Sequence, residues 1–134
     1  MADGPRVVVR QVGPSTGQGF VRGHSLLVDR PESKGGEDRG PMGGELLLLG
    51  LGGCFMSNFL AAIRERDAPI RDVEVTVSAH AEGTPPRMTA FEIQVSATHD
   101  DRDLFQKIAT IAERGCIASN TLKQGGAITV RLDK

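Results

Sequence analysis

The sequence contains no tryptophan and no tyrosine, and its aromatic content of 4% comes from phenylalanine alone. It also has no excess of basic residues, since 16 Lys and Arg stand against 17 Asp and Glu. Nucleic-acid binding typically uses a basic patch or aromatic residues interleaved with basic ones. The composition therefore argues against a nucleic-acid partner.

The sequence also shows no pattern typical of a signal peptide or a membrane-spanning segment. The first residues, Met-Ala-Asp-Gly-Pro, lack the apolar core of a signal peptide. The longest apolar run is interrupted by glycines and is shorter than the roughly 20 apolar residues that span a bilayer. We therefore expect a cytoplasmic protein without a membrane partner. The length of 134 residues indicates one domain, 1–134.

Candidate metal ligands are scarce. The three histidines are scattered, and neither they nor the two cysteines show zinc spacing, so no metal is expected. In a reducing compartment, two cysteines are more often free, metal-bound or redox-active than structural.

The chain is organised around the apolar stretch that contains Cys54. A helix is predicted over 45–66, and its run Leu46–Leu51 is apolar on every side. A monomer of this size buries only about two-thirds of its unfolded surface, so covering such a helix argues for a second subunit. The glycines beside Cys54 each cost a helix roughly 1 kcal/mol. They suggest the close approach of another backbone or room beside the thiol.

The remaining elements form an α+β pattern with no phosphate-binding βαβ motif and no internal repeat. Alternating apolar residues predict strands, and apolar residues at helical spacing predict helices. The predicted elements are N-terminal strands within 1–29 with a turn at 13–19, a loop at 30–44, an antiparallel hairpin at 73–97, two helices within 100–123 capped by Asp100 or Asp101, and a last strand at 127–132.

Cys54 and Cys116 carry the candidate chemistry. Ser57 and Asn58 follow Cys54 by three and four residues, so they share its helix face and are candidate partners for a thiolate. Cys116 falls where a helix begins, and a helix N-terminus lowers a thiol pKa. The alternative is that both cysteines are small buried hydrophobes, which is common for free cysteine.

The sequence resembles the OsmC/Ohr-like family at these residues. The helix segment Pro41–Cys54, with its ending Leu-Gly-Gly-Cys, resembles the family's central helix. Upstream, Gly23–Asp29 and the Gly35-Gly36 loop fit the same pattern, and Cys116–Leu122 resembles the second-cysteine segment. The match covers nearly the whole chain and is closer to the general OsmC-like branch.

The resemblance implies an intertwined homodimer with antiparallel sheets packed around two long central helices. It also implies a cysteine-based peroxidase of stress defence that reduces organic hydroperoxides and hydrogen peroxide without metal or another cofactor. Carried onto this sequence, Cys54 is the peroxidatic residue and Cys116 the resolving one. Their disulfide would be reduced by an external dithiol of lipoyl type or a small thiol.

Supporting residues are less defined by the resemblance. In the family, a Glu on this helix pairs with an Arg from the N-terminal region near the thiolate. Glu45 lies nine residues before Cys54, roughly on the opposite helix face at about 100° per residue. Candidate supporting residues are therefore Glu45, Arg10, Arg22, Arg39 and His24. A surface or structural role is the alternative for each of them.

Two other functions fit the same sequence. A non-catalytic protein could bind a small apolar ligand at the dimer interface, with the cysteines as packing residues. A thiol redox sensor would form the same disulfide, and the disulfide would change its interaction with a partner. A lowered thiol pKa at Cys54 would favour catalysis over passive binding.

Overall fold

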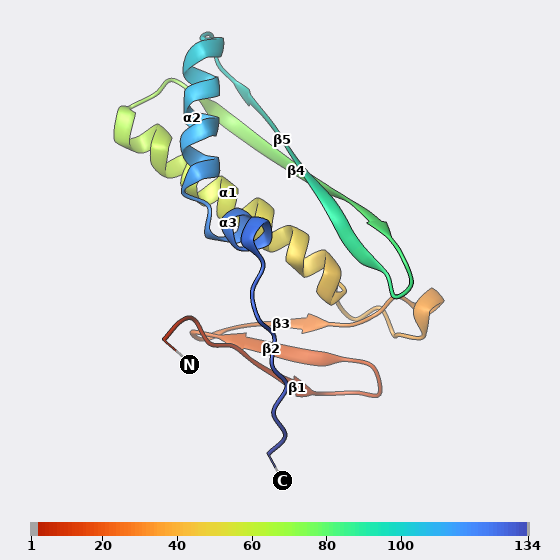
Figure 1. Cartoon of the computed structure of the whole chain (residues 1–134). Coiled ribbons are helices and arrows are strands. Elements are labelled where there is room, and N and C mark those ends of the chain that lie inside the picture. Colours follow the sequence, from red (N-terminus) through yellow and green to blue (C-terminus); the bar gives the residue numbers. More distant parts are fainter. Residues whose placement is uncertain (1–2, 134) are drawn as a thin grey trace. The chain divides into compact units, whose positions relative to one another are not determined.

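The computed structural model describes residues 3–133. Within them, the chain is α+β, with two antiparallel sheets and three α-helices, which confirms the predicted fold class. It forms two compact units, Met1–Leu47 and Leu48–Lys134, which we describe one at a time (Figure 1). The prediction of one domain over 1–134 stays a prediction.

The N-terminal unit is built on a three-stranded sheet of β1 (Val8–Gln11), β2 (Gly17–Val21) and β3 (His24–Val28), in the order β1-β2-β3. Arg22 and Gly23, with positive φ of 47° and 83°, form the turn between β2 and β3. Such two-residue turns match the twist of antiparallel strands. The predicted turn at 13–19 is wrong in its second half, because Gly17–Gly19 pair with both neighbouring strands.

Asp29 anchors the predicted loop at 30–44. Its buried carboxylate accepts hydrogen bonds from the Thr16 hydroxyl at 2.8 Å and from the backbone N–H groups of Arg30 at 2.7 Å and Arg39 at 3.3 Å. Burial opposes ionisation, but these bonds outweigh it and hold the Asp29 pKa well below its usual value. The loop also contains a short 3-10 helix, Glu32–Lys34, that the sequence did not predict.

Helix α1 (Gly43–Arg66) begins two residues earlier than predicted. Glu45 accepts a hydrogen bond from the Met42 N–H at 2.8 Å, which satisfies a donor at the helix start. At 24 residues, α1 is long and apolar enough to cross a bilayer, so the prediction that it is too short is wrong. Its buried residues nevertheless belong to the core of the C-terminal unit: Leu51, Phe55, Phe59 and Ala62.

The predicted hairpin consists of β4 (Arg71–Glu82) and β5 (Arg87–Thr98), paired antiparallel. Val75 faces Val95 and Val77 faces Ile93, so apolar side chains occupy one face of the hairpin and pack against the core. The alternate residues of both strands are exposed. This half-buried pattern is the one that the sequence alternation predicted.

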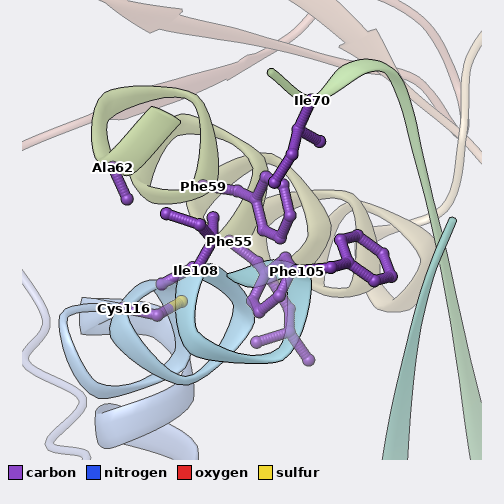
Figure 2. Packing of buried hydrophobic residues seen from close by; sticks show 9 residues of the cluster. Phe55, Phe59, Ala62, Ile70, Phe105, Ile108 and Cys116 are labelled. Atoms are coloured by element: carbon purple, nitrogen blue, oxygen red, sulfur yellow. The ribbon is translucent and has the colours of Figure 1, made fainter. Parts of the chain in front are cut away.

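Two helices complete the C-terminal unit. Asp101 caps α2 (Arg102–Arg114) by accepting from the Leu104 N–H at 3.1 Å, as predicted. Helix α3 (Ile117–Gln124) follows after a break at Gly115 and Cys116. Figure 2 shows the core between α1 and α2, where Phe59 and Ile108 are completely buried and Cys116 reaches the same cluster. The core thus extends directly to one of the two thiols.

The predicted last strand at 127–132 is not formed in this chain. These residues have no regular secondary structure, and Ile128, Val130 and Leu132 are 93%, 83% and 87% exposed. The alternating pattern is real, but among the described residues no strand pairs with the segment. A strand needs a paired neighbour, because it cannot satisfy its backbone groups internally.

Candidate active site

Cys54 and Cys116 meet in the C-terminal unit. Cys54 lies in the middle of α1, is half-buried and packs against the core. Cys116 is the residue immediately before α3 and is completely buried. The two side chains lie close enough for each thiol to shift the pKa of the other, although the cysteines are far apart in sequence. Both are free thiols, so the site contains a dithiol pair in contact.

The environment of Cys54 favours its thiolate. Burial alone would raise the pKa of the Cys54 thiol, but hydrogen bonds to its sulfur outweigh burial and lower the pKa below its usual value. The donors are the Ala118 N–H, the Cys116 thiol and the Ile117 N–H. Two of them are backbone groups in the first turn of α3, where free N–H groups favour negative charge.

The pKa of the Cys116 thiol is raised, whereas a lowered pKa was predicted from the sequence. Burial raises the pKa of the Cys116 thiol, and the neighbouring Cys54 raises it further through its hydrogen bond and negative charge. The Ser119 N–H donates to the Cys116 sulfur at 3.4 Å but does not offset these effects. The helix start does lower the Cys116 pKa, as predicted, through the N–H groups of Ser119 and Ala118, but burial and the neighbouring Cys54 outweigh it, so the net shift is upward.

Ser57 and Asn58 differ from each other in their surroundings. Ser57 is exposed to solvent, whereas Asn58 is half-buried and donates from Nδ2 to the Ala112 carbonyl at 3.4 Å. The donors that lower the Cys54 pKa come from α3 and Cys116 and include neither residue. Neither residue therefore makes the predicted contact with the Cys54 thiolate. Asn58 instead forms its hydrogen bond with α2.

The glycines beside Cys54 have different surroundings. A Cβ at Gly52 would lie 3.0 Å from Val77 Cγ2, so the missing side chain lets β4 approach α1. Gly50 and Gly53 face open space, with nothing within 4 Å of a Cβ in the part of the chain that the structure describes. The glycine cluster thus combines close packing on one face of α1 with free room on another.

The other candidate residues belong to the N-terminal unit. Arg22 and His24 are exposed at the turn between β2 and β3, and Arg39 is exposed in the 30–44 loop. The Arg10 guanidinium lies 5.2 Å from the ring centroid of Phe20, a cation–π contact. Glu45 caps the start of α1. Each has a structural or surface position there, and a role toward the thiols stays a prediction.

A cavity of about 400 Å³ is lined by residues of α1, β5 and α3, and neither thiol is among them. Five of its lining residues are apolar and three are polar: Leu51, Ala90, Phe91, Ile93 and Leu122, with Thr89, Ser119 and Lys123. Leu51 precedes Cys54 by about one helical turn, and the Ser119 N–H contacts the Cys116 sulfur. An apolar molecule in this cavity would lie next to the residues that flank both thiols.

Sequence reasoning missed the two donors of greatest chemical interest, the N–H groups of Ile117 and Ala118. Backbone groups carry no side-chain signal, and their contact with Cys54 depends on how α3 packs on α1. The one available signal was the helix start at Cys116, which predicted donors to the Cys116 sulfur but not those to the Cys54 sulfur. Among the described residues, no cluster of three or more His, Cys, Asp or Glu side chains is suited to a metal ion.

The fold and the site together define a small α+β protein with a half-buried thiol on its long helix α1 and a buried thiol at the start of α3. The family model described as OsmC-like protein matches residues 35–131, which is more than half of the chain. The chain therefore belongs to the OsmC-like family. No curated protein matches it significantly.

Solved structures share the fold. An OsmC-like protein from Mycoplasma pneumoniae has a TM-score of 0.78 at 16% identity and covers 93% of this chain and 90% of its own. An organic hydroperoxide resistance protein OsmC from Legionella pneumophila has a TM-score of 0.62 at 20% identity, with 92% and 91% covered. One from Elizabethkingia anophelis, named an organic hydroperoxide resistance protein, has a TM-score of 0.69 at 18% identity, with 93% of each chain covered.

Proposed function

We propose that this protein is a cysteine-based peroxidase that reduces organic hydroperoxides, and hydrogen peroxide, in oxidative or osmotic stress defence. The observation that carries the proposal is the contact between Cys54 and Cys116, whose pKa values shift in opposite directions. A peroxidatic thiol needs thiolate character, and a resolving thiol must be close to it. The names of the Legionella and Elizabethkingia neighbours support the same chemistry.

In the first step, the Cys54 thiolate attacks the terminal oxygen of the hydroperoxide. The O–O bond breaks, the sulfur gains the OH group as a sulfenic acid, and the alkoxide takes up a proton and leaves as an alcohol. The sulfur is oxidised and the peroxide is reduced by two electrons. The N–H groups of Ile117 and Ala118 assist by keeping Cys54 deprotonated.

In the second step, Cys116 resolves the sulfenic acid. Its sulfur attacks the Cys54 sulfur, a disulfide forms and water leaves with the thiol proton. The high pKa of Cys116 keeps this thiol protonated until Cys54 is oxidised, so the two residues do not compete as nucleophiles. An external dithiol of lipoyl type, or a small thiol, then reduces the disulfide by thiol exchange.

The cavity lined by Leu51 and Ser119, each three residues from one of the cysteines, suits the alkyl part of an organic hydroperoxide. Its volume of about 400 Å³ exceeds what hydrogen peroxide needs, and aromatic and aliphatic side chains dominate its lining. Apolar lining with a few polar groups is typical of small-molecule sites. We therefore place organic hydroperoxides ahead of hydrogen peroxide as substrates and propose a cytoplasmic location, where such a dithiol stays reduced.

The pH dependence of thiol reactivity tests the proposal directly. Only a thiolate is alkylated efficiently, and the unperturbed cysteine pKa is about 8.5. Because the Cys54 pKa is lowered, its iodoacetamide rate should stay high as the pH falls below that value, while the Cys116 rate should already have dropped. Peptide mapping after timed alkylation measures both rates in one sample.

Equal pH profiles for the two cysteines, or a reversed order, would contradict this assignment. In that case a passive role for the thiols would be favoured, and the apolar cavity would become the site of a binding protein. A search for a co-purifying apolar molecule would then be the next step.

The exposed face of α1 supports a homodimer. Leu49 is 64% exposed and lines an apolar hollow of about 320 Å³ with Gly53, Met56 and Val77. The 127–132 segment adds three further exposed apolar side chains. Exposed apolar surface of this extent marks an interaction site, and a second copy of the chain is the partner that we propose.

Analytical ultracentrifugation tests the proposed homodimer through its mass in solution. At micromolar concentration the protein should sediment at twice its chain mass of 14.3 kDa. Leu49→Glu should shift it toward the monomer, because a charge would be buried without a partner. Thr76→Glu, at an exposed position on the polar face of β4, should leave the mass unchanged. A stable folded monomer of the unmodified chain would refute the dimer.

A further inference from the structure

Asn58 connects the helix of Cys54 to the segment that carries Cys116. It follows Cys54 by four residues on α1, which places both side chains on one helix face. Its side chain is half-buried, and its Nδ2 donates to the Ala112 carbonyl in the last turn of α2 at 3.4 Å. A Cβ at Gly115, the residue before Cys116, would lie 3.7 Å from Asn58 Nδ2. Asn58 therefore contacts the chain just before the second thiol.

The bond matters because the end of α2 has unsatisfied carbonyls. In a continued helix the Ala112 carbonyl would accept from the Cys116 N–H, four residues later. Here the Cys116 N–H turns to the Glu113 carbonyl at 3.3 Å, so the chain leaves the helix. The completely buried Ala112 would then keep a carbonyl without a helical partner, and Asn58 supplies the donor.

The same turn sets the orientation of Cys116. Once α2 ends, Cys116 becomes the residue that caps α3 and accepts from the Ser119 N–H through its sulfur. Helix α3 then presents the N–H groups of Ile117 and Ala118 to Cys54. Figure 1 shows α2 descending onto α1 and α3 lying across it. The contact at Asn58 is thus a polar tie between α1 and the end of α2 just before this turn, in addition to the contact between the two thiols.

We propose that Asn58 is a positioning residue that holds Cys116 in reach of Cys54 for disulfide formation. The inference rests on the proposed peroxidase function. The affected step is the attack of the Cys116 thiol on the Cys54 sulfenic acid, which forms the S–S bond and releases water. Misplacement of a reacting group slows such a step strongly. Attack of Cys54 on a hydroperoxide should slow less, because Cys116 is not a reactant in that step and is only one of several donors to the Cys54 sulfur.

The test compares two rates in the full-length Asn58→Ala protein. After mixing with cumene hydroperoxide, consumption of the first equivalent reports sulfenic acid formation, and acid quenching with mass analysis reports the disulfide. The ratio of the second rate to the first should fall about tenfold, as expected for the loss of one partly buried hydrogen bond. Sulfinic acid at Cys54 should increase at the same time, because the sulfenic acid persists.

Asn120→Ala is the matched control. Asn120 also uses its amide to satisfy a carbonyl at the end of α2, that of Arg114 at 3.1 Å, but it lies on α3 and makes no tie to α1. Its loss should lower thermal stability comparably and leave the rate ratio as in the unmodified protein. An unchanged ratio in Asn58→Ala, or an equal fall in both variants, would overturn the positioning role.

Two further measurements keep the result interpretable. If Asn58→Ala does not fold, Asn58→Ser, whose hydroxyl is too short to replace the amide, should show the same fall. If the unmodified protein is not oxidised by hydroperoxide, the peroxidase proposal fails by itself. The equilibrium between the dithiol and the Cys54–Cys116 disulfide, measured in a dithiothreitol redox buffer, then tests the role of Asn58 without any hydroperoxide. It should shift about tenfold toward the dithiol in the variant, which corresponds to about 30 mV.

Discussion

Replacing Cys54 by serine is expected to abolish hydroperoxide turnover, with a loss on the order of 10³-fold or more, as for other enzymes that lose their nucleophile. A serine hydroxyl is not ionised near neutral pH, so the amide donors of α3 would have no thiolate to stabilise. Cys54 is half-buried, and serine is similar in size, so the fold should persist. Consumption of cumene hydroperoxide in the presence of a dithiol measures the effect.

The controls for this variant separate chemistry from folding. Far-ultraviolet circular dichroism and sedimentation should match those of the unmodified protein. Ser57→Ala, which changes an exposed residue one turn away on the same helix, should turn over at the normal rate. Turnover of the Cys54→Ser protein at the rate of the unmodified protein would refute the mechanism, because no other cysteine has a lowered pKa.

Replacing Cys116 by serine is expected to give one oxidation event followed by a stall. The first equivalent of hydroperoxide should still oxidise Cys54, since the N–H groups of Ile117 and Ala118 remain in place. Without a neighbouring thiol the sulfenic acid cannot form the internal disulfide, and excess peroxide converts it to sulfinic acid. Stopped-flow consumption and intact mass report the burst, the stall and a gain of two oxygens.

The two variants together define which thiol acts first. Dimedone should label Cys54 in the Cys116→Ser protein and should label nothing in the Cys54→Ser protein. Steady turnover by Cys116→Ser with a dithiol, without sulfinic acid, would mean that the external thiol reacts with the sulfenic acid directly. Cys116 would then be a packing residue in the core rather than a resolving one.

Local patterns were sufficient to predict most of the fold. The alternation along β4 and β5, the Asp101 cap and the apolar run of α1 each depend on residues close together in sequence. Predictions at glycines were less accurate. Gly17 and Gly19 suggest a turn by composition, yet they occupy β2 because strands on both sides pair with it.

The site was predictable only in part. The choice of Cys54 and Cys116 came from a resemblance, because nothing local shows that two cysteines on different helices touch. The direction of each pKa shift depends on which sulfur receives the amides of α3, and this is decided by packing between α3 and α1. The partner of Asn58 was likewise set by the end of α2.

The segment at 127–132 shows a third limit of sequence reasoning. Its alternating residues predict a strand, but a strand requires a neighbour, and none pairs with it in the described part of the chain. Exposure of Ile128, Val130 and Leu132 is compatible with a partner supplied by another subunit. The proposed homodimer would supply such a neighbour, and the pattern alone does not say which strand it would be.

The most direct measurement is intact-mass spectrometry of the reduced protein after one equivalent of cumene hydroperoxide, followed by peptide mapping. A mass loss of two hydrogens with a crosslink between the Cys54 and Cys116 peptides is the predicted result. It would establish that hydroperoxide oxidises the pair as a unit. Two free, unmodified thiols after the same treatment would contradict the peroxidase function.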